Sequence, residues 1–483
     1  MSSRYFHLCR PGKAPGRASA LLVFAAGVLL PALAASAQVR QTGVDIYEEQ
    51  LRVRLDQQVP TAREVGLDYG GWFNFAVFDY DDAAAARTRT LRQFQLRGWA
   101  SVNVQGVHRG YVRGLLAWDD WKGHDNTIAG RGDTFDDELE RAWYLFDFGQ
   151  LLFNQTGQQP PVAFKVKVGR DFATIGTAFV LAIPLDMVQF NIDTANWRFM
   201  TLLGKTKKDT NNIDDSARVA HHMDRCFFGA ELAYRGLDNH EPFVYFLTQQ
   251  DHTSPASADA AQSYDYSSRY LGVGSTGTVV SPDLRYRAEA VGEWGKTYSE
   301  NMLTDQDRIC AWALDAGLEY LPMVRMRPKL TAEYMFGSGD SDRRLSANST
   351  VGGNRAGTKD EAFNAFGFRD TGIAFAPRVS NIHIYTAGAS FFPLEKHELF
   401  RKMEIGTKIF LYHKAKAGGP ISDTTATKGT RWLGWEWDVF CDWRLTSDLA
   451  WTIRYGLFRP GAAFGPSANS GRHMLYTGVI FSF

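Results

Sequence analysis

The C-terminal stretch, residues 449–483, changes hydropathy at every second residue. The odd positions of its first nine residues are all apolar or aromatic, whereas the even ones are Ala, Thr, Arg and Gly: Leu449, Trp451, Ile453, Tyr455 and Leu457. A period of two is the period of a β-strand. The final segment, 473–483, repeats it and ends the chain on an aromatic residue. One face therefore suits lipid while the other accepts arginine, which predicts strands of a transmembrane β-barrel.

Composition excludes a helical membrane protein. The chain has 483 residues, of which 45% are hydrophobic and 13% aromatic. A spanning helix needs about 20 consecutive apolar residues, and no such run follows the first ~37 residues. The aromatic residues and the 45 glycines suit strands, turns and interfacial girdles. A large soluble β-protein has a similar composition, so the prediction of a membrane barrel depends on the strand pattern.

Residues 1–37 have the features of a secretory signal peptide. A basic start precedes the apolar run 18–33, and Ala35-Ser36-Ala37 forms a small-x-small cleavage site before Gln38. We expect 38–64 to be a short periplasmic segment and 65–483 to be the barrel. Removing the four basic residues of the signal leaves 49 basic and 53 acidic residues. This balance gives no basic excess for nucleic acid.

The residues that could carry chemistry do not form a site. The three cysteines left after cleavage cannot all pair, and we expect them to be small residues on the apolar strand face: Cys226, Cys310 and Cys441. The histidine pair 221–222 and the acidic cluster 133–138 lack the spacing of a dedicated metal site. No Gly-x-Ser-x-Gly nucleophile setting occurs. We therefore expect neither an enzyme nor a bound cofactor or metal.

From residue 65 to the end the alternation predicts about eighteen strands, with no amphipathic helix among them. Their limits, to within about three residues, are 65–81, 90–105, 110–121, 139–149, 161–172, 185–193, 197–206, 224–236, 240–252, 266–278, 284–298, 307–322, 326–340, 381–394, 400–414, 431–445, 449–461 and 473–483.

The lengths of the connections alternate as well. Short connections follow most of the even-numbered strands: 193–196, 236–240, 393–398 and 445–448. Long polar connections follow most of the odd-numbered ones: 122–138, 207–223, 253–265, 341–380, 415–430 and 462–472. An all-β, up-and-down antiparallel barrel with short periplasmic turns and long outer loops predicts this alternation, with both termini periplasmic.

Charged residues keep to one face of the strands. In the strand 431–445, for example, Trp435, Trp437 and Trp443 occupy odd positions, whereas the carboxylates occupy even ones. Such regularity predicts water on the charged side, and hence an aqueous lumen rather than a packed core. The lumen-facing arginines include Arg97, Arg113, Arg285, Arg287 and Arg454. Acidic residues on the same face nearly balance the basic ones, so a count of charges predicts no ion selectivity.

Short motifs along the predicted barrel resemble those of the bacterial alginate outer-membrane exporter family, from about residue 65 to the end. The most specific of these motifs lies near the C-terminus, where residues 456–461 are followed by 464–466. The others are 96–100, 168–170 with 185–186, 336–340, 362–363, 380–382 and 434–438. The resemblance implies an eighteen-stranded barrel that passes an anionic exopolysaccharide out of the cell.

The same resemblance implies roles for individual arginines, since those lining a narrowed pore attract the uronate chain in that family. Arg97 matches one within its Leu-Arg-x-Trp-Ala context, and Arg369 matches another six residues after Phe363. Arg355 shares only a dipeptide with the family, and Arg141 lies within one residue of a family arginine. Arg454, already assigned to the lumen by its strand position, is displaced from a family arginine by one inward-facing step.

We therefore expect an outer-membrane channel of a Gram-negative bacterium that exports an anionic, alginate-like exopolysaccharide, working beside periplasmic synthesis proteins. The alternative is a general or substrate-specific uptake porin for small solutes, and a third is an outer-membrane enzyme on a barrel scaffold. Segment 341–380 is far longer than a connection needs to be. We expect it to fold inward and narrow the pore, with Phe363 and Phe366 anchoring it to the wall.

Overall fold

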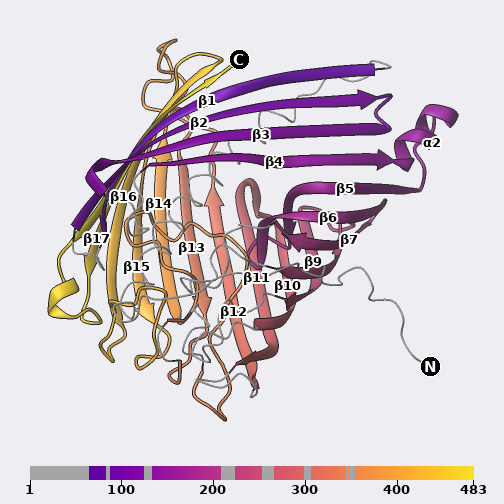
Figure 1. Cartoon of the computed structure of the whole chain (residues 1–483). Coiled ribbons are helices and arrows are strands. Elements are labelled where there is room, and N and C mark those ends of the chain that lie inside the picture. The colour runs from indigo at the N-terminus through magenta and orange to yellow at the C-terminus, as the bar shows by residue number, and fades with distance from the viewer. Residues whose placement is uncertain are drawn as a thin grey trace, which may run out of the picture.

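The computed structural model describes residues 65–82, 87–124, 133–207, 224–252, 266–298, 306–343, 346–347 and 354–483. The predicted signal peptide and the lead-in 38–64 lie outside these residues. The described chain forms one eighteen-stranded antiparallel sheet in which each strand pairs with its neighbours in sequence (Figure 1). The predicted up-and-down barrel is therefore confirmed.

The strands are β1 (Val65–Asp82), β2 (Arg87–Val104), β3 (His108–Trp121), β4 (Thr134–Asp147), β5 (Val162–Ile175), β6 (Leu181–Thr194), β7 (Trp197–Thr206), β8 (Arg225–Tyr234), β9 (His240–Asp251), β10 (Tyr266–Val279), β11 (Ser281–Tyr298), β12 (Gln306–Tyr320), β13 (Lys329–Gly337), β14 (Ile382–Phe391), β15 (Met403–Lys414), β16 (Trp432–Arg444), β17 (Leu449–Pro460) and β18 (Arg472–Ser482). Each matches one predicted strand. Two short 3-10 turns, η1 (Lys122–His124) and η3 (Pro466–Ala468), lie in connections.

The sheet closes on itself because β18 pairs with both β17 and β1. Trp72 lies opposite Ser482, and the C-terminal Phe483 exchanges two backbone hydrogen bonds of 3.0 Å with Gly71. Unpaired backbone groups are costly in lipid, so a spanning sheet has to close. The aromatic C-terminus thus completes the seam.

In the described part of the chain, one α-helix lies between two strands, contrary to the sequence prediction. The α2 helix (Phe148–Thr156) follows β4 directly and lies at the right of the barrel in Figure 1. The side chain of Asp147 caps its first turn by accepting from the N–H of Gln150, and Gly157 ends it with φ 71°. Its nine residues are too few and too mixed to show a clear helical period. None of the helices in the described residues is long and apolar enough to cross a membrane.

The two ends of the barrel differ as the connection lengths predict. The end that we call the turn end carries the connections after the even-numbered strands: 105–107, 148–161, 195–196, 235–239, residue 280, 321–328, 392–402 and 445–448. The opposite end, the loop end, carries the long connections 338–381, 415–431 and 461–471. Of the loop-end connections that the structure describes in full, one is short, since only residues 176–180 join β5 to β6.

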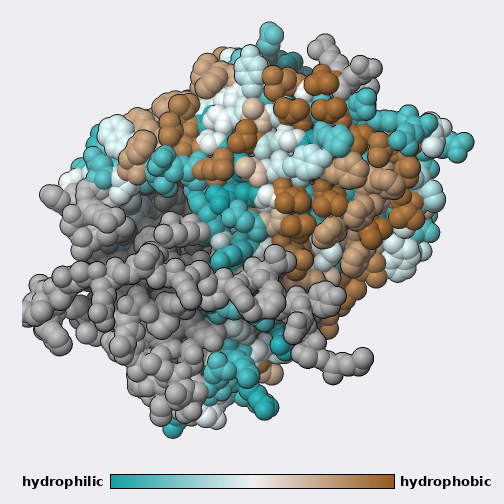
Figure 2. Space-filling model, turned by 45° about the vertical axis from the view of Figure 1, so that its right-hand side comes forward, coloured by the Kyte–Doolittle hydropathy of each residue, from teal (hydrophilic) through white to brown (hydrophobic). Residues whose placement is uncertain are grey.

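The strands sort their side chains between two faces. On β16, Trp437 is 41% exposed whereas its neighbours Glu436 and Asp438 are buried. Apolar side chains gather in a band over the outer face, which Figure 2 shows as brown atoms across the right-hand side of the molecule. None of the cysteines in the described residues forms a disulfide or is fully buried, and each occupies an outward strand position: Cys226, Cys310 and Cys441. The predicted assignment of faces is confirmed for these strands.

Trp437→Arg tests the lipid face directly. We expect a loss of roughly 2–4 kcal/mol in the free energy of unfolding if the site lies near the bilayer midplane. Unfolding in urea, followed by loss of the heat-modifiable band, measures it. Trp437→Phe is the matched control and should fold normally. Equal loss in both variants would show that position 437 does not face lipid.

Inward-folded chain fills part of the lumen that the strand charges predicted. Two apolar clusters pack there. One, near β5–β12, includes Phe363 and Phe366, and the other, near β13–β18 and β1, includes Ala374 and Phe375. All four residues belong to the connection between β13 and β14. The charged wall residues therefore meet protein as well as water, which strand alternation alone does not reveal.

Candidate functional site

Two segments from the loop end occupy the lumen. We call residues 338–381, between β13 and β14, the inner loop, and residues 176–180, between β5 and β6, the strap. They pair with each other: the N–H of Phe366 donates to the carbonyl of Val180 at 2.8 Å, and the N–H of Ala182 donates back to Phe366 at 2.8 Å. The predicted inward folding of 341–380 is thus observed over its described part.

The two aromatic residues of the inner loop lie where the sequence predicted anchors. Phe363 stacks on Phe179 of the strap with ring centroids 5.9 Å apart. Phe366 meets Phe227 of β8 edge-on at 5.0 Å. Both rings are almost completely buried. Their burial ties the inner loop to the wall opposite the strands from which it starts.

The inner loop extends the sheet at Asp360. β13 ends at Gly337, which lies opposite Ala313, so β12 runs further toward the loop end than its neighbour. Asp360 lies beside Ile309 there, and its N–H donates to the carbonyl of Arg308 at 2.9 Å. Burial raises the pKa of the Asp360 carboxyl, while the guanidinium of Arg343 at 3.1 Å opposes that shift. This buried pair fixes the inner loop where it leaves the sheet.

Wall carboxylates hold the inner loop and the strap by their backbone. Glu436 of β16 accepts hydrogen bonds from three successive N–H groups, at 2.6, 2.6 and 2.8 Å: Ile373, Ala374 and Phe375. Glu293 of β11 accepts from the N–H of Asn364 at 3.0 Å. Glu289 accepts from the N–H of Thr177 at 2.8 Å. These carboxylates are therefore docking points for inward-folded chain and do not line open water.

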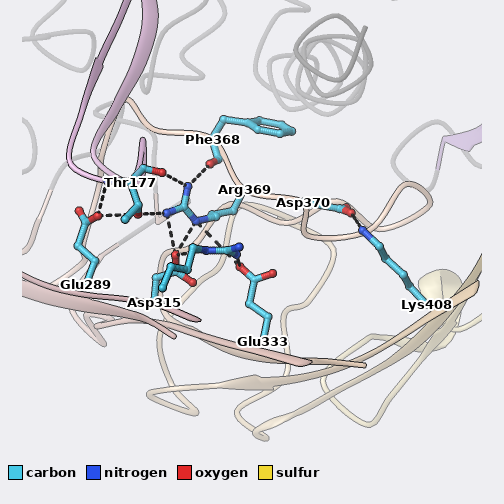
Figure 3. Close-up of polar contacts among 9 residues, drawn as sticks. Thr177, Glu289, Asp315, Glu333, Phe368, Arg369, Asp370 and Lys408 are labelled. Atoms are coloured by element: carbon cyan, nitrogen blue, oxygen red, sulfur yellow. Dashed lines mark hydrogen bonds and ion pairs between the residues drawn. The ribbon is translucent and has the colours of Figure 1, made fainter. Parts of the chain in front are cut away.

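Arg369 lies at the centre of this arrangement (Figure 3). Its Nε donates to Asp315 at 2.7 Å, and its Nη1 donates to the carbonyl of Thr177 in the strap at 2.9 Å. Arg287 of β11 shares Asp315 at 3.1 Å and also pairs with Glu333. The two guanidinium groups and the two carboxylates of this cluster balance in charge. Arg369 thereby joins the inner loop, the strap and the barrel wall at one point.

The next residue of the inner loop contacts another part of the wall, two strands further along the barrel. Asp370 pairs with Lys408 of β15, away from the Arg369 group in Figure 3. The side chains of Asp370 and Lys408 are 45% and 33% exposed, so this ion pair is open to lumen water. Together the two contacts carry the inner loop from β12–β13 across to β15.

A second group of charges lies on β2–β4. Arg97 and Arg113 both bind the carboxylate of Glu140, at 2.9 and 2.8 Å. Both guanidinium groups lie over the ring of Trp72, 5.7 and 5.6 Å from its centroid. Sequence reasoning placed the two arginines in the lumen but missed Glu140.

The reason is an extra residue in β4. Arg113 lies opposite Arg141, while the next residue, Gly114, lies opposite Leu139, so Glu140 is the extra residue of a β-bulge. The bulge lets Glu140 and Arg141 face the lumen together. Arg141 binds Asp171 of β5 at 3.3 Å, and Lys167 binds the same carboxylate at 2.8 Å.

We call these six side chains the cationic wall: Arg97, Arg113, Arg141, Lys167, Glu140 and Asp171. Four cations share two carboxylates, and neighbouring strands bring them together. The remaining predicted arginines lie elsewhere. Arg454 pairs with Asp442 at 2.8 Å. Arg285 and Arg355 are exposed and belong to neither group.

A closed barrel with an apolar outer band and a charged, partly filled lumen defines a porin-like channel of the outer membrane. The model of the alginate export family matches residues 163–477. The chain belongs to that family, and its place is the outer membrane of a Gram-negative bacterium. No curated protein matches the chain.

Solved structures of outer-membrane proteins share the fold. OpdK from Pseudomonas aeruginosa is 9% identical with a TM-score of 0.53, covering 86% of this chain and 99% of that one. OccK11 (OpdR) from the same organism is 10% identical with a TM-score of 0.52, covering 86% and 96%. A structure of P. aeruginosa OpdK with vanillate is 8% identical with a TM-score of 0.52, covering 86% and 98%. At such identities the likeness concerns the fold alone.

Proposed function

We propose that this channel secretes an anionic exopolysaccharide of the alginate type across the outer membrane, without covalent chemistry or a cofactor. The observation that carries the proposal is the cationic wall, where Glu140 and Asp171 are each shared by two basic side chains. A passing uronate presents one carboxylate per sugar and competes with these two residues for the same donors. Exchange of this kind binds the chain at many weak sites, and conduction requires weak binding.

The inner loop supports a gated channel within this proposal. It crosses the lumen from β12 to β16 and is held by the wall residues Glu293 and Glu436 and by the bond of its own Arg369 to Asp315. A polymer needs a continuous passage, so secretion would require the crossing part to shift. Periplasmic proteins that make the polysaccharide are the expected partners at the turn end, which is the periplasmic end of such barrels.

The proposal is tested by polymer block of single channels in a planar bilayer. Polymannuronate should block the purified protein, and uncharged dextran of equal length should block it less. Arg97→Ala should weaken the block roughly tenfold at low salt, which corresponds to about 1.4 kcal/mol. The effect should be smaller at high salt, because the distance over which charges interact becomes shorter as ionic strength rises. Glu140→Gln, which removes a competing carboxylate, should strengthen it.

Two results of this block experiment would contradict export of an anionic polymer. If polymannuronate failed to block the wild-type channel under any salt condition, an anionic polymer would not be its substrate. A block that was indifferent to both Arg97 and Glu140 would remove the cationic wall from the pathway.

Uptake of small organic anions is the second candidate. It is favoured by the shared fold with OpdK, which binds vanillate in one solved structure, and by a lumen narrowed from the loop end. Liposome swelling with vanillate and with oligomannuronate separates the two functions. Entry of vanillate alone, with no polymer block, would favour uptake.

A further inference from the structure

A row of aromatic rings lies on the lumen face near the turn end. Trp99 of β2, Tyr111 of β3 and Trp143 of β4 share the strand face of Arg97, Arg113 and Arg141. The residues of opposite parity point to lipid, as Leu96 at 42% and Val112 at 45% exposure show. The three rings are only half-buried, so they are accessible from the lumen.

The rings form an overlapping row. The centroids of Trp99 and Tyr111 are 6.1 Å apart and those of Tyr111 and Trp143 are 5.6 Å apart, with interplanar angles of 19° in both pairs. Nearly parallel rings in direct face contact would lie about 3.5–4 Å apart, so at these distances each ring is displaced sideways from the next. Each therefore leaves part of its face uncovered.

Glycine at position 70 lets the first ring lie against the wall. Gly70 is the cross-strand partner of Trp99, and a Cβ added there would come within 3.3 Å of Cζ2 and Nε1 of the indole. The last ring has a cation beside it, since Nζ of Lys167 lies 5.9 Å from the centroid of Trp143. The apolar surface of the three rings therefore lies next to a basic group that can bind an anion.

A pyranose ring is the ligand that fits this combination. Its axial C–H groups make an apolar, weakly positive face that suits the negative face of an aromatic ring, while its carboxylate or hydroxyl groups reach outward to polar partners. We propose that Trp99, Tyr111 and Trp143 form an aromatic track that binds the sugar rings of the polysaccharide at the periplasmic mouth. The track rests on the proposed function and adds to it recognition of the sugar ring besides its charge.

The test uses full-length protein in planar bilayers, with two probes added from the turn end. One is a hexamer of β-1,4-linked mannuronate and the other is uncharged cellohexaose. The double variant Trp99→Leu/Trp143→Leu keeps apolar bulk but loses both indoles. We expect the rate at which each probe leaves the channel to rise roughly tenfold, equivalent to about 1.4 kcal/mol, at low and high salt alike. Trp99→Phe/Trp143→Phe should retain most of the binding.

Two controls separate the track from the proposed function and from folding. Tyr144→Leu changes a neighbouring aromatic residue on the lipid face, which is 46% exposed, and should leave block unchanged. Heat modifiability confirms that each variant is a folded barrel. In one outcome, the wild type is blocked by cellohexaose but not by the uronate, and this block is lost in the leucine variant. That result would support the track and contradict export of an anionic polymer. Uronate block that was unchanged in the leucine variant, or no block of the wild type by either probe, would overturn the track.

Discussion

Replacement of residues 362–375 by a short glycine–serine linker is expected to raise single-channel conductance several-fold. This is the part of the inner loop that crosses the lumen, from the buried Phe363 to the residues docked on Glu436. Removing it takes away Arg369 and the apolar contacts of Phe363 and Phe366 inside the barrel. The strands pair with one another without these residues, so the barrel should still assemble. Planar-bilayer recording measures the change.

Excision of α2 provides the control for this experiment. The helix lies beyond the strand ends, where its contacts are with β5 (Figure 1). Its replacement by a linker should leave conductance as it was. If the channel without 362–375 conducted like the wild type while remaining heat-modifiable, the narrowest point would lie elsewhere in the lumen.

Glu436→Ala should release the inner loop from β16 without unfolding the barrel. The carboxylate accepts three backbone hydrogen bonds, from Ile373, Ala374 and Phe375. Hydrogen bonds to a charged group contribute about 1.5–3 kcal/mol each, so we expect the docked state to lose about 3 kcal/mol or more. Hydrogen exchange of 371–376 should become faster by at least about a hundredfold, and the open-channel current should become noisier.

Two variants locate the cause of that effect. Glu436→Gln keeps one acceptor oxygen and the shape of the side chain, so its exchange rate should fall between those of the wild type and the alanine variant. Trp435→Phe lies next to it on the lipid face and should change nothing. Unchanged protection of 371–376 in Glu436→Ala would mean that Phe375 and its aromatic neighbours hold the loop without the carboxylate.

The strands could be predicted from the sequence because the requirement for an apolar outer face applies to nearly every second residue. Alternation also placed Arg97 and Arg287 correctly on the lumen side. It could not predict their partners, since a cross-strand contact depends on the register between two strands. The pairing of Arg287 with both Asp315 and Glu333 is a property of three neighbouring strands together.

Glu140 was missed because the assignment of residues to the lumen or lipid face assumes that the two faces alternate without a break along each strand. In the structure, Phe135 and Leu139 of β4 are exposed at odd positions, whereas Tyr144 is exposed at an even one. A change of parity within one strand indicates an extra residue between the two halves. The docking of the inner loop was predictable only in outline. Its length and its aromatic residues indicated inward folding, but the acceptors Glu293 and Glu436 lie in strands distant in sequence.

The extra residue in β4 also bears on how such barrels diverge. A substitution that brings a new charge into a lumen replaces a side chain already there, whereas a single insertion adds one and leaves the lipid-facing residues on either side intact. The extra residue, Glu140, lies next to Arg141 on the lumen face, so an acid and a base are side by side there. Homologues that lack the insertion would present only one of these two positions to the substrate. A difference of one residue in a spanning strand can therefore change which charges face the lumen while the same side chains still face the bilayer.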